Sequence, residues 1–161
     1  MSYAELFSKN ILQSKGMIGS FLKDFSDAEM YFRPAKTANH ATWQMGHLAH
    51  SVRGMVTTCD PSIVFQFEDD TRFGKSKASI DDPAFSPSRA ELLGRFDQAM
   101  DTAAGWVAKL SDAELAKPTP ERMRQFAPTV ANAAMLLASH PFMHIGQFTV
   151  MRRALGKPIL F

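Results

Sequence analysis

Two histidines, His140 and His144, lie four residues apart in a long apolar run near the end of the chain. On a helix, residues i and i+4 share one face and lie one turn apart. Two imidazoles in that arrangement can hold a transition-metal ion between consecutive turns. A third histidine, His47, lies in an equally apolar run much earlier in the chain. We expect the three side chains to meet in the middle of a helical bundle and to hold a divalent metal ion.

The alternative is a histidine-rich core without an ion. A single His-x-x-x-His pair is more often two buried, hydrogen-bonded imidazoles, because short motifs often arise by chance. The third histidine favours a metal, since three dry and unpaired imidazoles would cost about 1–3 kcal/mol each. One shared ion satisfies a nitrogen of each, at ~2.0–2.1 Å for zinc. Three neutral ligands also leave a coordination position open to water or substrate, which is typical of catalytic sites.

Two of the five histidines lie outside this set. His50 follows His47 by about one helical turn, so it is an alternative ligand, a residue supporting the ligands, or a core residue. It is also the only evident candidate for a general base, although the sequence gives it no partner. His40 precedes the same apolar run, and we expect it to be exposed or to cap a helix.

Other side chains near the histidines have weaker claims. Gln147 follows His144 by three residues and either supports a ligand or bonds to the backbone. Trp43 precedes His47 by four residues, and core packing is the preferred interpretation. The acidic run Glu68-Asp69-Asp70 offers a hard ligand, but such runs usually form solvated surface. Cys59 is most simply a small buried apolar residue.

Composition excludes several classes of protein. The chain has 161 residues, of which 45% are hydrophobic and 21% charged, which is ordinary for one globular domain spanning 1–161. A formal net charge of +2, without a basic stripe, gives no reason to expect nucleic-acid binding. A single cysteine excludes a disulfide framework and fits a reducing compartment. No signal peptide or membrane span is evident, so we expect a cytoplasmic protein.

Apolar residues recur at helical spacing in four long segments, so the sequence predicts an all-α protein. The predicted helices cover residues 2–25, 39–59, 88–110 and 129–155. Asn39 is the predicted N-cap of the second helix. Residues 60–86 show neither a helical nor a strand period. Ile63, Val64, Phe65 and Phe67 are nevertheless expected to pack against the bundle. Pro141 should kink the last helix, either re-aiming His140 or disturbing the i, i+4 geometry.

The two halves of the chain resemble each other. Each reads helix, Ser-Asp-Ala-Glu connector, helix, and in each second helix an Asn precedes a His by eight residues. These pairs are Asn39 with His47 and Asn132 with His140. The match is short and compatible with chance. It predicts two αα-hairpins packed face to face, joined by a long crossover between the second and third helices.

Three blocks of sequence together resemble the DinB-like (damage-inducible) superfamily. The blocks are Trp43-x-x-Gly46-His47-Leu48, His140-x-x-x-His144-x-Gly146-Gln147 and Arg152-Arg153-x-Leu155-Gly156-Lys157-Pro158. The resemblance covers about residues 39–161, with a compatible first helix. It implies a four-helix bundle in up-down-down-up order, often dimeric, in which His47, His140 and His144 hold a divalent ion, usually zinc or nickel. The Pro-Phe-Met segment between the last two histidines departs from the pattern, since many relatives carry polar residues there.

Members of that superfamily with known activity include metal-dependent transferases that use bacillithiol, and the mycothiol-dependent maleylpyruvate isomerase is similar. The resemblance therefore implies an enzyme that joins a low-molecular-weight thiol to an electrophilic small molecule, or a hydrolase if water takes the thiol's place. DNA binding is not implied. The competing hypothesis is a non-catalytic stress or interaction protein, a homodimer whose ion ties two hairpins together.

Overall fold

The computed structural model describes residues 1–74 and 87–160. Four long helices dominate this part of the chain: α1 (Tyr3–Leu22), α2 (Ala41–Cys59), α3 (Arg89–Val107) and α6 (Val130–Ala154). Shorter elements lie in the connections: η1 (Glu29–Tyr31), η2 (Thr71–Phe73), α4 (Asp112–Leu115) and α5 (Glu121–Arg124). The predicted all-α class is confirmed, and the predicted long helices match the observed ones to within a few residues at each end.

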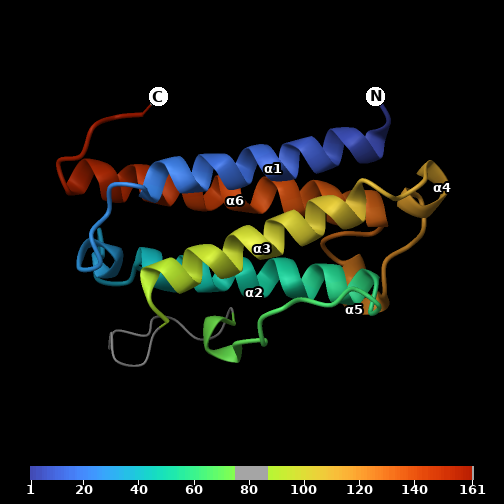
Figure 1. Cartoon of the computed structure of the whole chain (residues 1–161), viewed down its shortest axis with the longest axis horizontal. Helices are drawn as coiled ribbons and strands as arrows, with labels where there is room; N and C mark the ends of the chain where they lie inside the picture. Colours follow the sequence, from blue (N-terminus) through green and yellow to red (C-terminus); the bar gives the residue numbers. More distant parts are fainter. Residues whose placement is uncertain (75–86, 161) are drawn as a thin grey trace.

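The four long helices form a bundle in up-down-down-up order, as expected (Figure 1). In Figure 1, α1 and α6 run in one direction and α2 and α3 in the other. The main contacts join α1 with α6 and α3, and α2 with α3 and α6. The first predicted hairpin consists of α1 and α2, and the second consists of α3 and α6. The main contacts join helices of different hairpins, and the two helices of one hairpin lie diagonally across the bundle. The described part of the crossover that follows α2, residues 60–74, passes along the side of the bundle.

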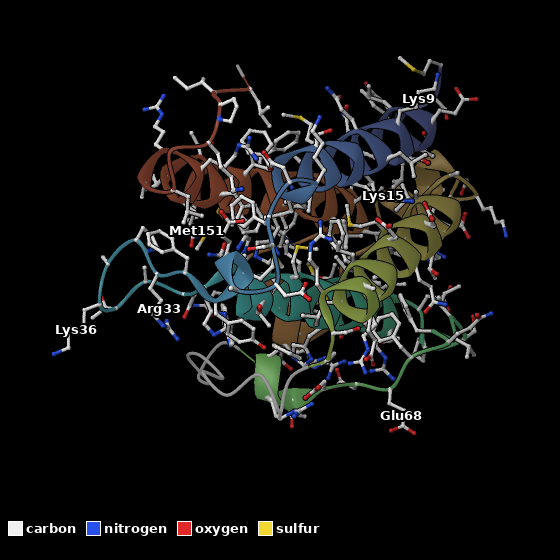
Figure 2. All side chains as sticks on the ribbon, turned by 60° about the vertical axis from the view of Figure 1, so that its left-hand side comes forward. Lys9, Lys15, Arg33, Lys36, Glu68 and Met151 are labelled. Carbon is white, nitrogen blue, oxygen red and sulfur yellow. The ribbon has the colours of Figure 1, made fainter. Side chains whose placement is uncertain are left out.

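The side chains that the apolar pattern assigns to the core are buried along all four helices. Examples of fully buried residues are Ile11, Leu48, Phe96 and Phe148. Figure 2 shows Met151 turned into the bundle, whereas Glu68 projects away from it. Helix spacing thus correctly separates the core face from the solvent face.

The start of α2 differs from the prediction, because His40 and not Asn39 is the N-cap. The His40 ring accepts a hydrogen bond from the backbone N–H of Trp43 at 3.0 Å. His40 is 0% exposed, so of its two predicted roles capping is correct and exposure is wrong. The carbonyl of Asn39 instead accepts from the amide of Gln44 at 2.8 Å. Histidine is an uncommon N-cap, which is why Asn39 was the expected one.

The resemblance between the two halves extends to the connectors but not to the histidines. Ser26 and Glu29 exchange hydrogen bonds between side chain and backbone, as do Ser111 and Glu114. However, His47 lies seven residues after its N-cap, and His140 lies eleven residues after its N-cap, Thr129. The eight-residue Asn–His spacing therefore does not mark equivalent helix positions.

Four apolar residues at the start of the 60–86 segment were predicted to pack against the bundle, and three of them do. Phe65 is 8% exposed, and Ile63 and Phe67 contact the core. Val64 is the exception, with 82% of its surface exposed. Phe73, in η2, is 1% exposed and lies against α2. The rest of the predicted irregular segment, 75–86, lies outside the described residues.

Pro141 does not interrupt α6, which runs as one helix from Val130 to Ala154. The ring of Pro141 is buried within the bundle. The helix therefore keeps the i, i+4 relation of the histidines on either side.

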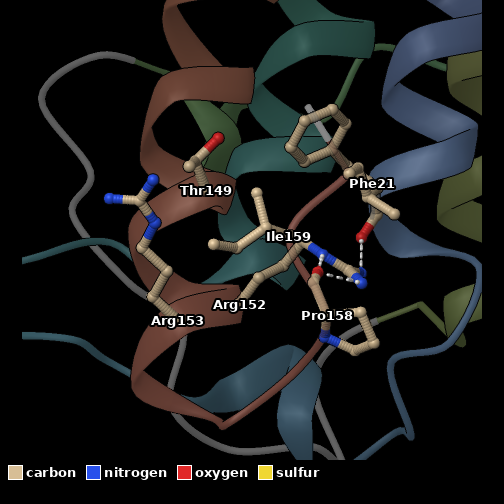
Figure 3. Close-up of a pocket in the computed structure, with 7 residues that line it drawn as sticks. Phe21, Thr149, Arg152, Arg153, Pro158 and Ile159 are labelled. Atoms are coloured by element: carbon tan, nitrogen blue, oxygen red, sulfur yellow. Dashed lines mark hydrogen bonds between the residues drawn. The ribbon is translucent and has the colours of Figure 1, made fainter.

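Arg152 joins the end of α6 to the end of α1 and to the C-terminal tail (Figure 3). Its guanidinium is 3% exposed and donates to the carbonyls of Phe21 at 2.8 Å and Pro158 at 3.1 Å, and to the Asp24 carboxylate. That pairing is the main cause of the lowered pKa of Asp24. Gly156 follows the C-cap of α6 in the left-handed conformation, at φ 68°, which glycine adopts without steric cost. A cation near the end of a helix suits the negative end of the helix dipole, but the main partners of Arg152 are these three groups.

Replacing Arg152 with methionine should lower the free energy of unfolding by about 2–4 kcal/mol, because two backbone carbonyls and a carboxylate lose a charged donor. The neighbouring Arg153 is exposed and points away from the tail (Figure 3), so Arg153→Met should change stability by less than about 0.5 kcal/mol. Urea unfolding of both variants measures the difference. Equal stabilities of the two variants would show that the buried guanidinium does not join these segments.

No helix within residues 1–74 or 87–160 combines the length and apolar character that a membrane span requires.

Candidate metal centre

Three histidines meet between α2 and α6, at the place where the sequence predicted a metal site. One ring nitrogen of each of His47, His140 and His144 lies within 4.8 Å of the others. The Nε2 atoms of His140 and His144 are 3.3 Å apart. Two nitrogens bound to one tetrahedral zinc ion at ~2.05 Å would be roughly 3.4 Å apart. The pair on α6 thus already has the spacing of two ligands, and a small shift of His47 would complete the set.

Gln44 orients the His144 ring. The Gln44 side-chain NH2 donates to the carbonyl of Asn39 at 2.8 Å, which leaves its Oε1 to face His144 Nδ1 at 2.8 Å. An amide oxygen only accepts, so His144 Nδ1 carries the proton and Nε2 keeps its lone pair. Gln44 and His144 are both buried. This bond leaves His144 Nε2 able to bind a metal ion, which is the effect that outer partners have in metal sites.

A backbone carbonyl orients His47 in the same way. His47 Nδ1 donates to the carbonyl of Phe73 at 3.0 Å, so its Nε2 is also unprotonated. The ring stacks on Trp43, with the centroids 4.7 Å apart and the planes 7° from parallel. Ser51 lies 3.4 Å from His47 Nε2 and can donate to it. Trp43 therefore holds a candidate ligand in place, in addition to its predicted packing role.

Close packing holds the Phe73 carbonyl beside His47. A Cβ atom on Gly46 would lie 2.3 Å from Cδ1 of the Phe73 ring, far inside contact distance. The ring is 1% exposed and has little freedom to move. Only glycine at position 46 allows this approach, which accounts for the Gly-His pair in the first sequence block.

Burial keeps all three imidazoles neutral. The pKa of His140 falls to about 4 and that of His144 to about 3, mainly because burial disfavours the charged ring and secondarily because the rings would repel one another. Burial also lowers the pKa of His47, against the opposing effect of its bond to the Phe73 carbonyl. Neutral imidazole is the form that binds a metal.

These pKa values predict how stability depends on pH without metal. Above the unfolded pKa near 6.5, both states are neutral and stability is constant. Below this pKa the unfolded chain takes up protons that the folded protein excludes, so the free energy of unfolding falls as the pH is lowered. The slope should approach ~1.4 kcal/mol per pH unit for each buried histidine between pH 6.5 and 5. Urea unfolding in chelator measures it, and His144→Phe should remove one histidine's share. An unchanged slope in that variant would contradict the burial of a neutral ring.

An open pocket of about 680 Å³ reaches the cluster, and both His47 and His140 line it. Met143, from the Pro-Phe-Met segment, is 60% exposed and lies on its wall. A molecule in this pocket can therefore reach two of the three histidines. A purely structural metal site would be closed on all sides.

His50 lies outside the cluster but lines the same pocket. Its Nδ1 lies 2.6 Å from the Asp69 carboxylate, which also faces Arg53 at 3.7 Å. Because a carboxylate accepts, His50 Nδ1 carries the proton and Nε2 is available as a base. The sequence offered no such partner. Asp69 is exposed, as expected for the acidic run, and in addition it pairs with His50.

The remaining candidates do not join the cluster. Glu68 is exposed, and Asp70 pairs with Arg72 at 2.6 Å. Gln147 is also exposed, and the amide that supports a ligand is that of Gln44. Cys59 is half-buried with its sulfur 3.9 Å from that of Met123, and burial raises the pKa of its thiol, in line with the predicted apolar role.

Two residues that orient the candidate ligands were missed in the sequence. Gln44 precedes His47 by three residues, so a polar residue on an otherwise apolar helix face was an available signal. Phe73 contributes a backbone carbonyl, which any residue could supply, so no sequence signal existed for it.

The chain belongs to the DinB superfamily, whose family model matches residues 13–148. Among solved structures, the chain is similar to a conserved protein from Enterococcus faecalis, with a TM-score of 0.72 and 15% sequence identity. That similarity covers 98% of this chain and 99% of the other, and at this identity it supports the fold alone. No protein with a curated description matches the sequence.

Proposed function

We propose that this protein is a divalent-metal-dependent enzyme that transfers a low-molecular-weight thiol to an electrophilic small molecule, with His47, His140 and His144 as the ligands of a zinc or nickel ion. The observation that carries the proposal is the convergence of three neutral imidazoles at an open pocket, two of them with Nδ1 held by a hydrogen-bond acceptor. Hydrolysis, with water in place of the thiol, is the variant of the same proposal.

The bound ion would lower the pKa of a thiol or water beside it and so provide a nucleophile at neutral pH. The residues of the chain have separate tasks. Phe73 and Gln44 keep two Nε2 atoms directed at the site, and Trp43 fixes the plane of one ring. His50, oriented by Asp69, would accept the proton of the thiol at Nε2 as the sulfur attacks carbon and the leaving group departs with its electron pair.

Several further expectations belong to the proposal. Nothing in the described fold requires nucleic acid or a membrane as partner, and a cytoplasmic location suits thiol chemistry. The protein is expected to be a homodimer, which sedimentation would test. The competing hypothesis, a metal-stabilised interaction protein, predicts a closed site, and the 680 Å³ pocket at the histidines favours the enzyme.

The test is a screen of untagged, zinc- or nickel-loaded protein against pairs of thiols and electrophiles, with ester substrates for hydrolysis. We expect turnover that disappears in His144→Ala and falls about 10²–10⁴-fold in His50→Gln, the range for loss of a general base. Turnover that His144→Ala leaves intact would exclude the site. Strong thermal stabilisation by the ion without any turnover would favour the interaction protein.

A further inference from the structure

The pocket at the histidines is a groove along α2 and α6 that extends well beyond the metal centre. On α2 its lining begins at His47 and continues through Ser51 and Gly54 to Thr58. Eleven residues of helix separate its ends, which corresponds to roughly 16 Å. α5 and the residue after its C-cap close the far end. The groove is therefore long enough for an extended molecule, with the histidines at one end.

The walls of the groove are mainly apolar, although much of their surface is open to solvent. Phe126 is 58% exposed and Met143 is 60% exposed, which is high for side chains of this size. Met55 and Met123 lie on the same walls. Methionine adapts to ligands of different shape because it is unbranched and polarizable. Such walls suit a flexible apolar chain better than a polar substrate.

The far end carries a fixed positive charge. Arg122, on α5, lines the groove and donates to the hydroxyl of Thr58, at the end of α2 opposite to His47. Among the described residues, the lining of this groove includes no aspartate or glutamate. The Arg122 guanidinium has five donor N–H groups, so the bond to Thr58 leaves donors for a ligand. An anionic group at this end would meet a cation without meeting a competing carboxylate.

We propose that the groove binds an elongated apolar molecule with a carboxylate at one end, which pairs with Arg122 while the opposite end lies at the three histidines. The inference rests on the proposed function, since it names the substrate class of that same site. The lining of α2 spans roughly 16 Å between the end that would hold the carboxylate and the end at the histidines. Arg122 is thus a specificity-determining residue and takes no part in the chemistry.

The test compares octanoate with octanamide, which have the same chain but differ in charge. Both are titrated into the full-length protein as purified, and the methyl resonances of Met143 and Met123 report binding in the groove. We expect octanoate to bind about 5–10-fold more tightly than octanamide, the effect of one partly exposed charged pair. In Arg122→Gln the two should bind equally. Arg153→Gln removes the same charge from an exposed position on α6 and should keep the preference.

Equal affinities in the wild type, or a preference that survives Arg122→Gln, would overturn the proposal. Repeating the titration with a chelator tests the pairing with Arg122 independently of the proposed metal-dependent function. The preference should persist without the ion, because the guanidinium acts without it. A preference that the chelator abolishes would show that the carboxylate binds the metal, which also overturns the pairing with Arg122. Absence of turnover would contradict only the proposed enzyme.

Discussion

His144→Ala is expected to weaken zinc and nickel binding by more than about 100-fold. His144 is the most buried of the three imidazoles, and its Nε2 already lies at ligand spacing from that of His140. Loss of an outer hydrogen-bond partner alone costs about 10–100-fold in metal affinity, and loss of a ligand should cost more. Titration against a competing chromophoric chelator measures the affinity. The affinity should fall because the two remaining imidazoles bind an ion more weakly than three do.

The matched control for this substitution is His50→Ala. His50 lies on the same pocket and pairs with Asp69, but it is not one of the three clustered histidines. Its removal should leave metal affinity within a few-fold of wild type. If His50→Ala released the ion and His144→Ala retained it, the ligands would have to be His50 and other residues of α2 and of the acidic run, and not the three clustered histidines.

Gly46→Ala should both destabilise the protein and weaken metal binding, although position 46 contacts no ion. The new Cβ would lie 2.3 Å from the buried Phe73 ring, so η2 has to move. Overpacking of this kind typically costs about 1–3 kcal/mol. Movement of η2 also carries away the carbonyl that orients His47, which should weaken metal affinity about 10–100-fold. Urea unfolding and chelator competition measure the two effects.

Two further variants test whether the contact with Phe73 causes the effects of Gly46→Ala. Gly54→Ala, two turns later on α2, meets nothing within 4 Å and should stabilise the helix by about 0.5–1 kcal/mol. Adding Phe73→Leu to Gly46→Ala should recover part of the lost stability, since a smaller side chain makes room for the methyl group. A Gly46→Ala protein as stable as Gly54→Ala would show that the close approach does not exist.

The features that follow from periodic apolar patterns were predictable from the sequence. The four long helices and the shared face of His140 and His144 depend only on helical spacing, which tertiary contacts reinforce. His47 could be assigned to the same site because a histidine on an apolar face is costly without a partner. Pro141 was expected to affect the geometry of the two histidines, and α6 continues through it as one helix with His140 and His144 at i and i+4.

Features that depend on contacts between distant segments were not predictable. The carbonyl of Phe73 orients His47 across 26 residues, and a backbone group has no signature in the sequence. Asp69 meets His50 only because the crossover folds back against α2. Arg152 has its partners at the end of α1, in the segment that follows α1, and in the C-terminal tail, all far from it in the sequence or beyond its own helix. In each case at least one partner lies in a connection or in the tail, whose course no local pattern determines.

The decisive measurement for the three-histidine site is the metal content of the protein. Untagged protein is incubated with zinc or nickel, freed of unbound metal by gel filtration and subjected to elemental analysis, beside a variant in which His47, His140 and His144 are all alanine. We predict one divalent ion per chain in the wild type and none in the variant. A wild-type protein that remains free of metal after this treatment, or a triple variant that binds as much as the wild type, would contradict it.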